Sequence, residues 1–248
     1  MKSRNKISKL FDAIENAVAK KEKLLAVLID PEKMKSEHLP DFFKRINTSI
    51  ATHIFVGGST DVDHQNDLLI KSIKSYTTLP VIIFPGDVEQ LSPYADGLLF
   101  LSLVSGRNPE YLIGKQIESV ATLRKMQLEI ISTGYLLIEN GKRTAVERVT
   151  ETQPLNRQNV QKIVDTAKAS ELLGMKCIYL EAGSGALKPI NSEIISAVKN
   201  DLEIPLFVGG GIRTKKQLDE AYASGADLVV IGTAFEEDQS FFEALQKN

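Results

Sequence analysis

The sequence contains almost no cysteine, and its charges nearly cancel. Cys177 is the only cysteine among 248 residues, so no disulfide can form within the chain. A reducing cytoplasm is therefore the expected setting. The 30 lysine and arginine residues balance 32 aspartate and glutamate residues, which argues against a nucleic-acid-binding protein.

Long apolar runs are also absent. No segment is apolar for long enough to span a bilayer, and the N-terminal residues lack the apolar stretch of a signal peptide. The three histidines, His38, His53 and His64, are scattered and do not have the spacing of metal ligands. These absences exclude a membrane-spanning protein and a histidine-based metal centre.

Short apolar runs alternate with helical patterns along the chain, which is typical of a parallel sheet with crossover helices. Eight strands are predicted, at residues 24–30, 53–57, 81–84, 97–101, 129–137, 176–180, 205–208 and 227–231. The length matches a single (β/α)8 barrel of roughly 250 residues. We therefore predict an α/β fold, a single TIM barrel, with residues 1–248 as one domain.

One connection is too short for this pattern. Only ten residues separate Gly86 from Gly97, whereas a parallel crossover usually needs about a dozen or more. A truncated third helix is therefore expected. Two consequences stay open. Either a single helical turn covers the sheet, or a gap exposes an apolar groove long enough for the hydrocarbon chain of a substrate.

Glycine-rich segments follow the last two predicted strands. Gly209, Gly210 and Gly211 come after residues 205–208, and Gly232 and Thr233 come after residues 227–231. Glycine lets backbone N–H groups approach an anion closely. Turns after strands seven and eight form the usual phosphate site of this barrel, so a phosphorylated small molecule is the predicted ligand.

Polar residues end three other predicted strands. Asp30 ends the first, where a carboxylate would hold Mg²⁺ or cap the following segment. Ser59 follows the second, as a possible ligand of a metal or diphosphate or as a helix cap. Glu181 ends the sixth and is placed as a general base, or as one half of a buried ion pair. Tyr179 would lie one layer deeper, and Cys177 is assigned to the core.

Three basic residues complete the candidate set. Arg213 follows the triple glycine, and Lys142 and Arg143 lie in the polar loop after strand five. Each could reach a phosphate or diphosphate. A solvated surface position is the alternative for all three.

Several segments together resemble the geranylgeranylglyceryl phosphate synthase family over nearly the whole chain. They are residues 28–33 (LIDPEK), 57–59 (GGS), 84–86 (FPG), 108–114 (NPEYLIG), 179–185 (YLEAGSG) and 208–213 (VGGGIR). The first and fifth segments are the specific ones, since many phosphate-binding barrels contain the glycine-rich segments.

The resemblance implies a Mg²⁺-dependent prenyltransferase. Such an enzyme joins a polyprenyl diphosphate, here expected to be geranylgeranyl diphosphate, to the 3-hydroxyl of sn-glycerol 1-phosphate, giving an ether lipid precursor and diphosphate. The resemblance places the metal on Asp30 and Ser59. It places the glycerol phosphate on Tyr179, Leu180, Glu181, Ala182, Gly183, Ser184, Gly185, Gly210, Gly211, Gly232 and Thr233. Glu181, with Tyr179 beside it, is the expected catalytic residue.

Two other functions compete with this interpretation. Another phosphate-binding barrel enzyme, of the sugar-phosphate isomerase or aldolase type, would often need an Asp pair or an inward lysine at a strand end, which the sequence does not clearly supply. A noncatalytic carrier would need neither Asp30 nor Glu181. A homo-oligomer, at least a dimer, and transient contact with a membrane surface are also expected.

Overall fold

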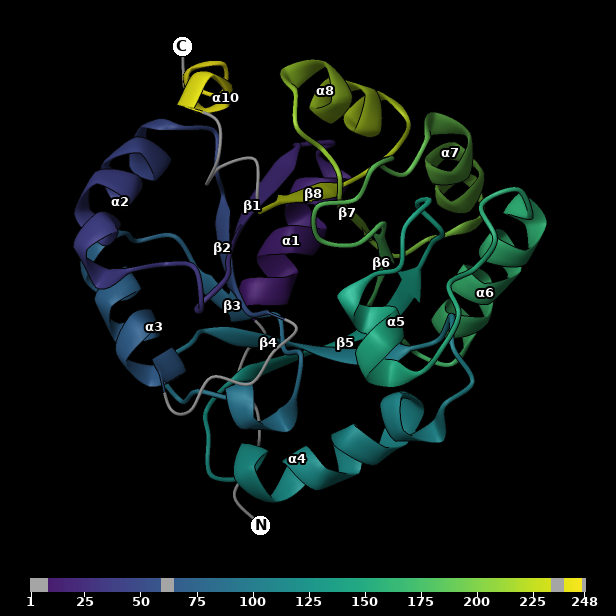
Figure 1. Cartoon of the computed structure of the whole chain (residues 1–248), viewed down its shortest axis with the longest axis horizontal. Helices are drawn as coiled ribbons and strands as arrows, with labels where there is room; N and C mark the ends of the chain where they lie inside the picture. Colours follow the sequence, from purple (N-terminus) through teal and green to yellow (C-terminus); the bar gives the residue numbers. More distant parts are fainter. Residues whose placement is uncertain (1–8, 59–64, 233–238, 247–248) are drawn as a thin grey trace.

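The computed structural model describes residues 9–58, 65–232 and 239–246. Eight strands form one closed parallel barrel in their order along the chain (Figure 1). They are β1 (Leu24–Ile29), β2 (His53–Val56), β3 (Val81–Ile83), β4 (Gly97–Leu103), β5 (Glu129–Leu137), β6 (Cys177–Glu181), β7 (Leu206–Gly209) and β8 (Leu228–Ile231). The predicted barrel is confirmed, and each strand ends within two residues of its predicted bounds.

Helices surround the barrel (Figure 1). They are α2 (Leu39–Thr48), α3 (Gln65–Tyr76), α4 (Lys115–Leu123), α5 (Ala145–Thr150), α6 (Val160–Leu172), α7 (Ser192–Asp201), α8 (Lys215–Ala223) and α10 (Gln239–Glu243), with short turns η1 (Ser36–His38), η2 (Val88–Gln90) and η3 (Glu110–Gly114). Within the described part of the chain, no helix combines the length and apolar character needed to cross a membrane.

Strand alternation divides the buried side chains into two sets. Phe55, Leu99 and Tyr179 belong to a cluster inside the barrel, whereas their neighbours Leu98 and Leu180 belong to a cluster that includes residues of the surrounding helices. Among the strand residues, those at inward positions near a strand end can therefore present their side chains to the barrel mouth.

Helix α1 (Lys9–Ala19) closes the amino-terminal end of the barrel. Phe11 and Ile14 are buried in the inner cluster. The Glu129 carboxylate accepts hydrogen bonds from the N–H groups of Leu10 and Phe11, at 2.9 and 2.8 Å. Ligands are therefore expected at the opposite end, where parallel barrels carry their active sites.

The connection from β3 to β4 contains only the η2 turn, so the predicted truncation of the third helix is confirmed. Because η2 is short, η3 and α4 cover part of the outer face of β4. In the connection from β5 to β6, the segment predicted as a polar loop contains α5. Thr144 and Glu147 form a reciprocal capping box at its start, a local signal that the sequence does carry.

Candidate active site

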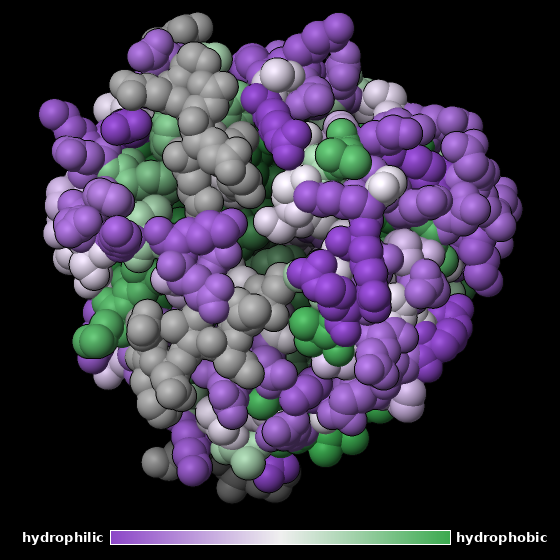
Figure 2. All heavy atoms as spheres, viewed as in Figure 1, coloured by the Kyte–Doolittle hydropathy of each residue, from purple (hydrophilic) through white to green (hydrophobic). Residues whose placement is uncertain are grey.

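A cavity of about 520 Å³ opens at the carboxyl ends of the strands. Its walls include Asp30, Glu181 and Gly210 from three strand ends, together with Leu98 and Phe100 on the outward face of β4. Figure 2 shows a hollow near the middle of this face, with hydrophobic residues in its depth and hydrophilic residues along the rim. The cavity thus joins a polar mouth to an apolar groove beside the truncated connection.

Glu181 is the buried carboxyl group at this mouth, with 6% of the residue exposed. One carboxyl oxygen accepts a hydrogen bond from the Gly183 N–H at 2.5 Å. Burial raises the pKa of Glu181 to about 7, although the Gly183 N–H and the Tyr179 hydroxyl act in the opposite direction. No lysine or arginine of the described residues forms an ion pair with it. A carboxyl group with this pKa can accept a proton near neutral pH.

Tyr179 lies one layer below Glu181 and is fully buried. No described residue forms a hydrogen bond of normal geometry with its hydroxyl. Burial, followed by the nearby Glu181, raises its pKa well above the usual value, so the hydroxyl stays protonated. The hydroxyl lies close to the Glu181 carboxyl group, and a polar ligand group at the mouth would give it a hydrogen-bond partner of better geometry.

Aromatic rings form the floor around Tyr179. The ring centroid of Tyr179 lies 5.2 Å from that of Phe84 and 5.5 Å from that of Tyr135. Phe207 packs edge-on against Tyr179, at 6.5 Å. Burial, together with Glu181, also raises the pKa of Tyr135 well above its usual value. The Glu181 carboxyl group therefore stands above a surface of aromatic rings.

Glycine is required beside the Glu181 carboxylate. An added Cβ at Gly209 would lie 2.2 Å from the Tyr179 hydroxyl oxygen. At Gly210 it would lie within van der Waals overlap of Glu181 Oε1, where backbone φ is also +85°. Gly211 has φ of +74°, and no described residue accepts a hydrogen bond from the N–H groups of Gly210 and Gly211. These N–H groups are suited to a phosphate.

The other predicted glycerol phosphate residues fall into three groups. Gly183, Ser184, Gly185 and Gly232 line the cavity. Leu180 and Ala182 flank Glu181 in the sequence, but strand alternation turns both side chains toward the outer cluster. The Ala182 N–H already donates to the Gly209 carbonyl, at 3.1 Å. Thr233 lies outside the described residues.

Asp30 lies at the cavity wall just after β1. Its Oδ1 accepts a hydrogen bond from the Glu32 N–H at 3.1 Å, and its Oδ2 lies 3.5 Å from Lys33 Nζ. The side chain therefore caps the turn that follows. The same Oδ1 lies beside Gly58, where an added Cβ would come within 3.0 Å. Ser59, the second predicted metal ligand, lies outside the described residues.

Basic side chains line the opposite rim. Lys142, Arg143, Arg148 and Arg213 all border the cavity and are exposed. Lys142 Nζ would lie 3.4 Å from a Cβ added at Gly185, so its charge is close to the Gly183–Gly185 turn. The residues are both solvated and placed to meet an anion.

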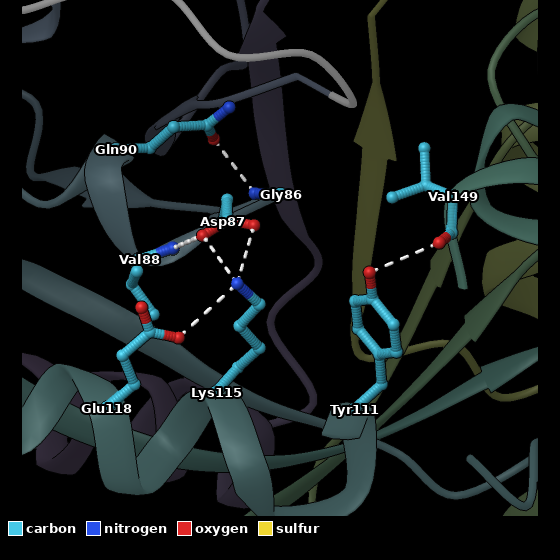
Figure 3. Close-up of polar contacts among 8 residues, drawn as sticks. All are labelled: Gly86, Asp87, Val88, Gln90, Tyr111, Lys115, Glu118 and Val149. Carbon is cyan, nitrogen blue, oxygen red and sulfur yellow. Dashed lines mark hydrogen bonds and ion pairs between the residues drawn. The ribbon is translucent and has the colours of Figure 1, made fainter. Parts of the chain in front are cut away.

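Three polar contacts flank the far part of the groove (Figure 3). Lys115 of α4 pairs with Asp87 at 3.1 Å and with Glu118 at 3.3 Å. Tyr111 of η3 donates a hydrogen bond to the Val149 carbonyl of α5, at 3.2 Å. The η3–α4 segment is thereby tied to both neighbours and forms the outer wall of the groove.

Comparison with known proteins agrees with this geometry. The PcrB family matches residues 16–248. The chain belongs to the PcrB family. The family predicted from the sequence is therefore confirmed, and the chain is an enzyme of the geranylgeranylglyceryl phosphate synthase type.

Three relatives illustrate the match. A geranylgeranylglyceryl phosphate synthase from Flavobacterium johnsoniae is 55% identical over 90% of this chain and 92% of its own. One from Korarchaeum cryptofilum is 37% identical over 95% and 97%. The crystal structure of (S)-3-O-geranylgeranylglyceryl phosphate synthase from Thermoplasma acidophilum, in complex with sn-glycerol-1-phosphate, has a TM-score of 0.88 at 32% identity and 95% coverage of each chain.

Several contributors to this PcrB-family site were not predicted as site residues. Tyr135 was missed although strand alternation places it on the inward face with Leu137. Asp87, Gln90 and Lys115 were missed because the contacts that tie them to other parts of the mouth, Lys115–Asp87 and Gln90–Gly58, join residues 28 and 32 positions apart. Of the signals behind these features, only the capping box and the strand alternation can be recognised from a few neighbouring residues in the sequence.

Proposed function

We propose that this chain transfers a polyprenyl group, with geranylgeranyl first, from its diphosphate to the 3-hydroxyl of sn-glycerol 1-phosphate. The observation that carries the proposal is Glu181, a buried carboxyl group with a pKa near 7. It stands between glycine turns suited to a phosphate and a groove suited to an apolar chain. The family relatives support the same reaction.

The glycerol phosphate belongs at the glycine turns. The N–H groups of Gly210 and Gly211 and the Lys142 ammonium supply positive potential for the phosphate. With the phosphate fixed there, the 3-hydroxyl points toward Glu181, and holding it in place lowers the entropic barrier to attack. The Tyr179 hydroxyl is a donor for the glycerol oxygens.

The reaction then needs one proton transfer and one substitution. The Glu181 carboxylate takes the proton from the 3-hydroxyl as the oxygen forms a bond to the allylic carbon of the donor. The bond from that carbon to the diphosphate oxygen breaks, and diphosphate leaves with the electron pair. The aromatic floor of Phe84, Tyr135 and Tyr179 suits the positive charge that develops on the allylic carbon.

The prenyl chain fits the groove over β4. Val88, Leu91, Leu98 and Phe100 provide apolar walls, and burying a long hydrocarbon there stabilises binding at about 25 cal/mol per Å². The basic residues of the opposite rim would attract the diphosphate and hold it near the mouth. The length of chain accepted depends on the Asp87, Tyr111 and Lys115 side of the groove.

The residues at the mouth fit Mg²⁺, which prefers oxygen ligands and is often held by one or two carboxylates together with substrate phosphates. Asp30 offers one carboxylate on the cavity wall, and no cluster of three potential ligands is found among the described residues. The diphosphate would thus complete the coordination. When bound, the ion would offset the negative charge of the leaving group.

We also expect a homo-oligomer, at least a dimer, in a reducing cytoplasm, with transient membrane contact during loading. Leu172 and Leu173 are each 78% exposed, and Ile113 and Ile117 on the outer side of the groove wall are more than half exposed. Contiguous exposed apolar residues favour such contacts. The free Cys177 thiol is buried in the core.

The test is a product assay. The purified protein is incubated with sn-glycerol 1-phosphate, Mg²⁺ and a ladder of polyprenyl diphosphates, and products are identified by mass spectrometry. We expect a prenylglyceryl phosphate ether, formed fastest with geranylgeranyl diphosphate. An absence of product with every polyprenyl diphosphate tested, while glycerol phosphate still binds, would contradict the proposed reaction.

A further inference from the structure

Gln90 joins two loops at the barrel mouth through its side chain. Its Oε1 accepts a hydrogen bond from the Gly86 N–H at 2.8 Å, and its Nε2 donates to the Gly58 carbonyl at 3.1 Å. Gly58 follows β2 and Gly86 follows β3, so one amide bridges two neighbouring strand ends. Figure 3 shows the bond from Gln90 to Gly86 beside Asp87 and Lys115.

Gln90 is held firmly in this position. It is only 2% exposed, and its backbone carbonyl oxygen accepts a hydrogen bond from the Asn66 side chain of α3 at 3.0 Å. Gln90 belongs to η2, the turn that replaces the third helix. A buried amide in this position is stable only if its polar atoms have partners, so the turn and the two loops are fixed together.

The two loops also touch directly. A Cβ added at Gly86 would lie 2.1 Å from the Gly58 carbonyl oxygen, so any change at Gln90 is transmitted to both. Gly58 lies against Asp30 Oδ1, and Gly86 precedes Asp87, which pairs with Lys115. Asp30 and Asp87 both line the cavity, but Gln90 does not.

We infer that Gln90 is a positioning residue for the diphosphate end of the site, setting the distance between the Asp30–Gly58 wall and the Gly86–Asp87 wall. The inference rests on the proposed function. Gln90 acts through the two loops and touches no substrate. Its loss should weaken the binding of diphosphate with Mg²⁺ and leave glycerol phosphate binding almost unchanged, because Gln90 bridges the loops after β2 and β3, across the barrel from the glycine turns after β6 and β7.

Two substitutions test this. Gln90→Met keeps the length of the side chain and removes both hydrogen bonds. Gln90→Glu keeps an acceptor for the Gly86 N–H but removes the donor to Gly58, and serves if the methionine variant does not fold. Calorimetry measures the Kd of inorganic diphosphate with Mg²⁺ and, separately, the Kd of sn-glycerol 1-phosphate. We expect diphosphate binding to weaken about tenfold or more, with the second Kd changed less than about twofold.

A matched control lies across the mouth. Gln217 Oε1 accepts a hydrogen bond from the Arg213 N–H, at 2.8 Å, and so supports the loop after β7. Gln217→Met should affect glycerol phosphate binding more than diphosphate binding, the reverse of the Gln90 pattern. Equal weakening of both ligands by Gln90→Met, or no change in either, would overturn the inference.

These outcomes are separable from failure of the proposed function. If the unmodified protein binds both ligands but forms no ether product, the reaction is wrong while the Gln90 comparison still stands. If the product forms and the Gln90 variants bind diphosphate normally, the reaction stands and the positioning role is wrong.

Discussion

The two halves of the barrel mouth are built by different means. In the half from β6 to β8, the turns around Glu181 are shaped by glycine backbone: Gly183, Gly185, Gly210 and Gly211 all have positive φ. In the half from β1 to β4, side chains hold loops together across long stretches of sequence, as the Gln90–Gly58 bond does over 32 positions. The glycine turns of the β6–β8 half can be recognised from short sequence motifs. The side-chain contacts of the β1–β4 half form only when the chain has folded.

The half from β6 to β8 also contains a buried side-chain amide, but this amide contributes less to the shape of its loops. Asn140 is 1% exposed; its side chain donates to the Ala182 carbonyl at 2.5 Å and accepts from the Lys142 N–H at 3.2 Å. It ties the loop after β5 to the turn after β6. The conformation of that turn already depends on the positive φ of Gly183 and Gly185, whereas Gly58 and Gly86 in the β1–β4 half do not have positive φ.

The largest expected effect is on Glu181. Glu181→Gln keeps the size of the side chain and removes the base, so kcat should fall by about 10²–10⁴-fold. The Kd of sn-glycerol 1-phosphate, measured by calorimetry, should change by less than about twofold, because the glycine turns remain. Equal losses in turnover and in binding would refute the assignment of Glu181 as the base.

Two glycine substitutions, one in each half, should separate the two ligands. Gly210→Ala forces a Cβ against Glu181 Oε1 and the Gly183 N–H, and Gly86→Ala forces one against the Gly58 carbonyl. We expect each to destabilise the fold by roughly 1–3 kcal/mol. Gly210→Ala should weaken glycerol phosphate binding about tenfold, and Gly86→Ala should do the same for diphosphate with Mg²⁺.

A control for these substitutions separates backbone strain from collision. Gly174 has φ of +91°, and an added Cβ would meet nothing within 4 Å. Gly174→Ala should therefore lower the unfolding free energy by about 1 kcal/mol with both ligand affinities intact. The comparison of the halves fails if Gly210→Ala and Gly86→Ala weaken both ligands to the same extent.

The pH dependence should report Glu181 in the free enzyme. Its pKa is raised to about 7, so kcat/KM should rise about tenfold per pH unit below 7 and level off above it. The folded state holds the proton more tightly than the unfolded chain does. Folding stability from this group is thus present below pH 4.5 and decreases, by roughly 3 kcal/mol in total, as the pH rises to about 7.

Chemical denaturation at several pH values checks the sign. Relative to Glu181→Gln, the unmodified protein should lose stability between pH 5 and 7, and the variant should lack this component. A rise in relative stability over the same interval would show that the carboxyl group has a lowered pKa in the folded protein, contrary to its burial.

The same contrast explains how much could be predicted from the sequence. Strand alternation and the glycine signals act over a few residues, so the barrel, the inward position of Tyr179 and the turn at Gly210 could be predicted. The bridge from Gln90 to Gly58 and the Asp87–Lys115 pair could not, because neither partner carries a pattern by itself. Leu180 shows a limit of motif transfer, since it lies within a functional segment but faces the outer helices.

The smallest expected effect concerns the groove wall. Lys115 and Asp87 are each about one quarter exposed in their side chains, so Lys115→Met should change the unfolding free energy by less than about 1 kcal/mol. Their pair nonetheless ties α4 to η2 where the third helix is truncated. Its loss should loosen the wall and shift the ratio of kcat/KM values toward longer prenyl donors by a few fold, which competition between two chain lengths measures directly.

Lys74→Met is the matched control for that experiment. Lys74 pairs with Asp96 at 2.6 Å, and neither residue lines the cavity. The control variant should keep the original preference. If Lys74→Met shifts the preference as much as Lys115→Met does, the shift reflects general loosening of the fold. If Lys115→Met lowers kcat/KM equally for every chain length, the pair supports catalysis and does not select the donor, and side-chain contacts in the β1–β4 half would then serve the same purpose as the glycine turns opposite.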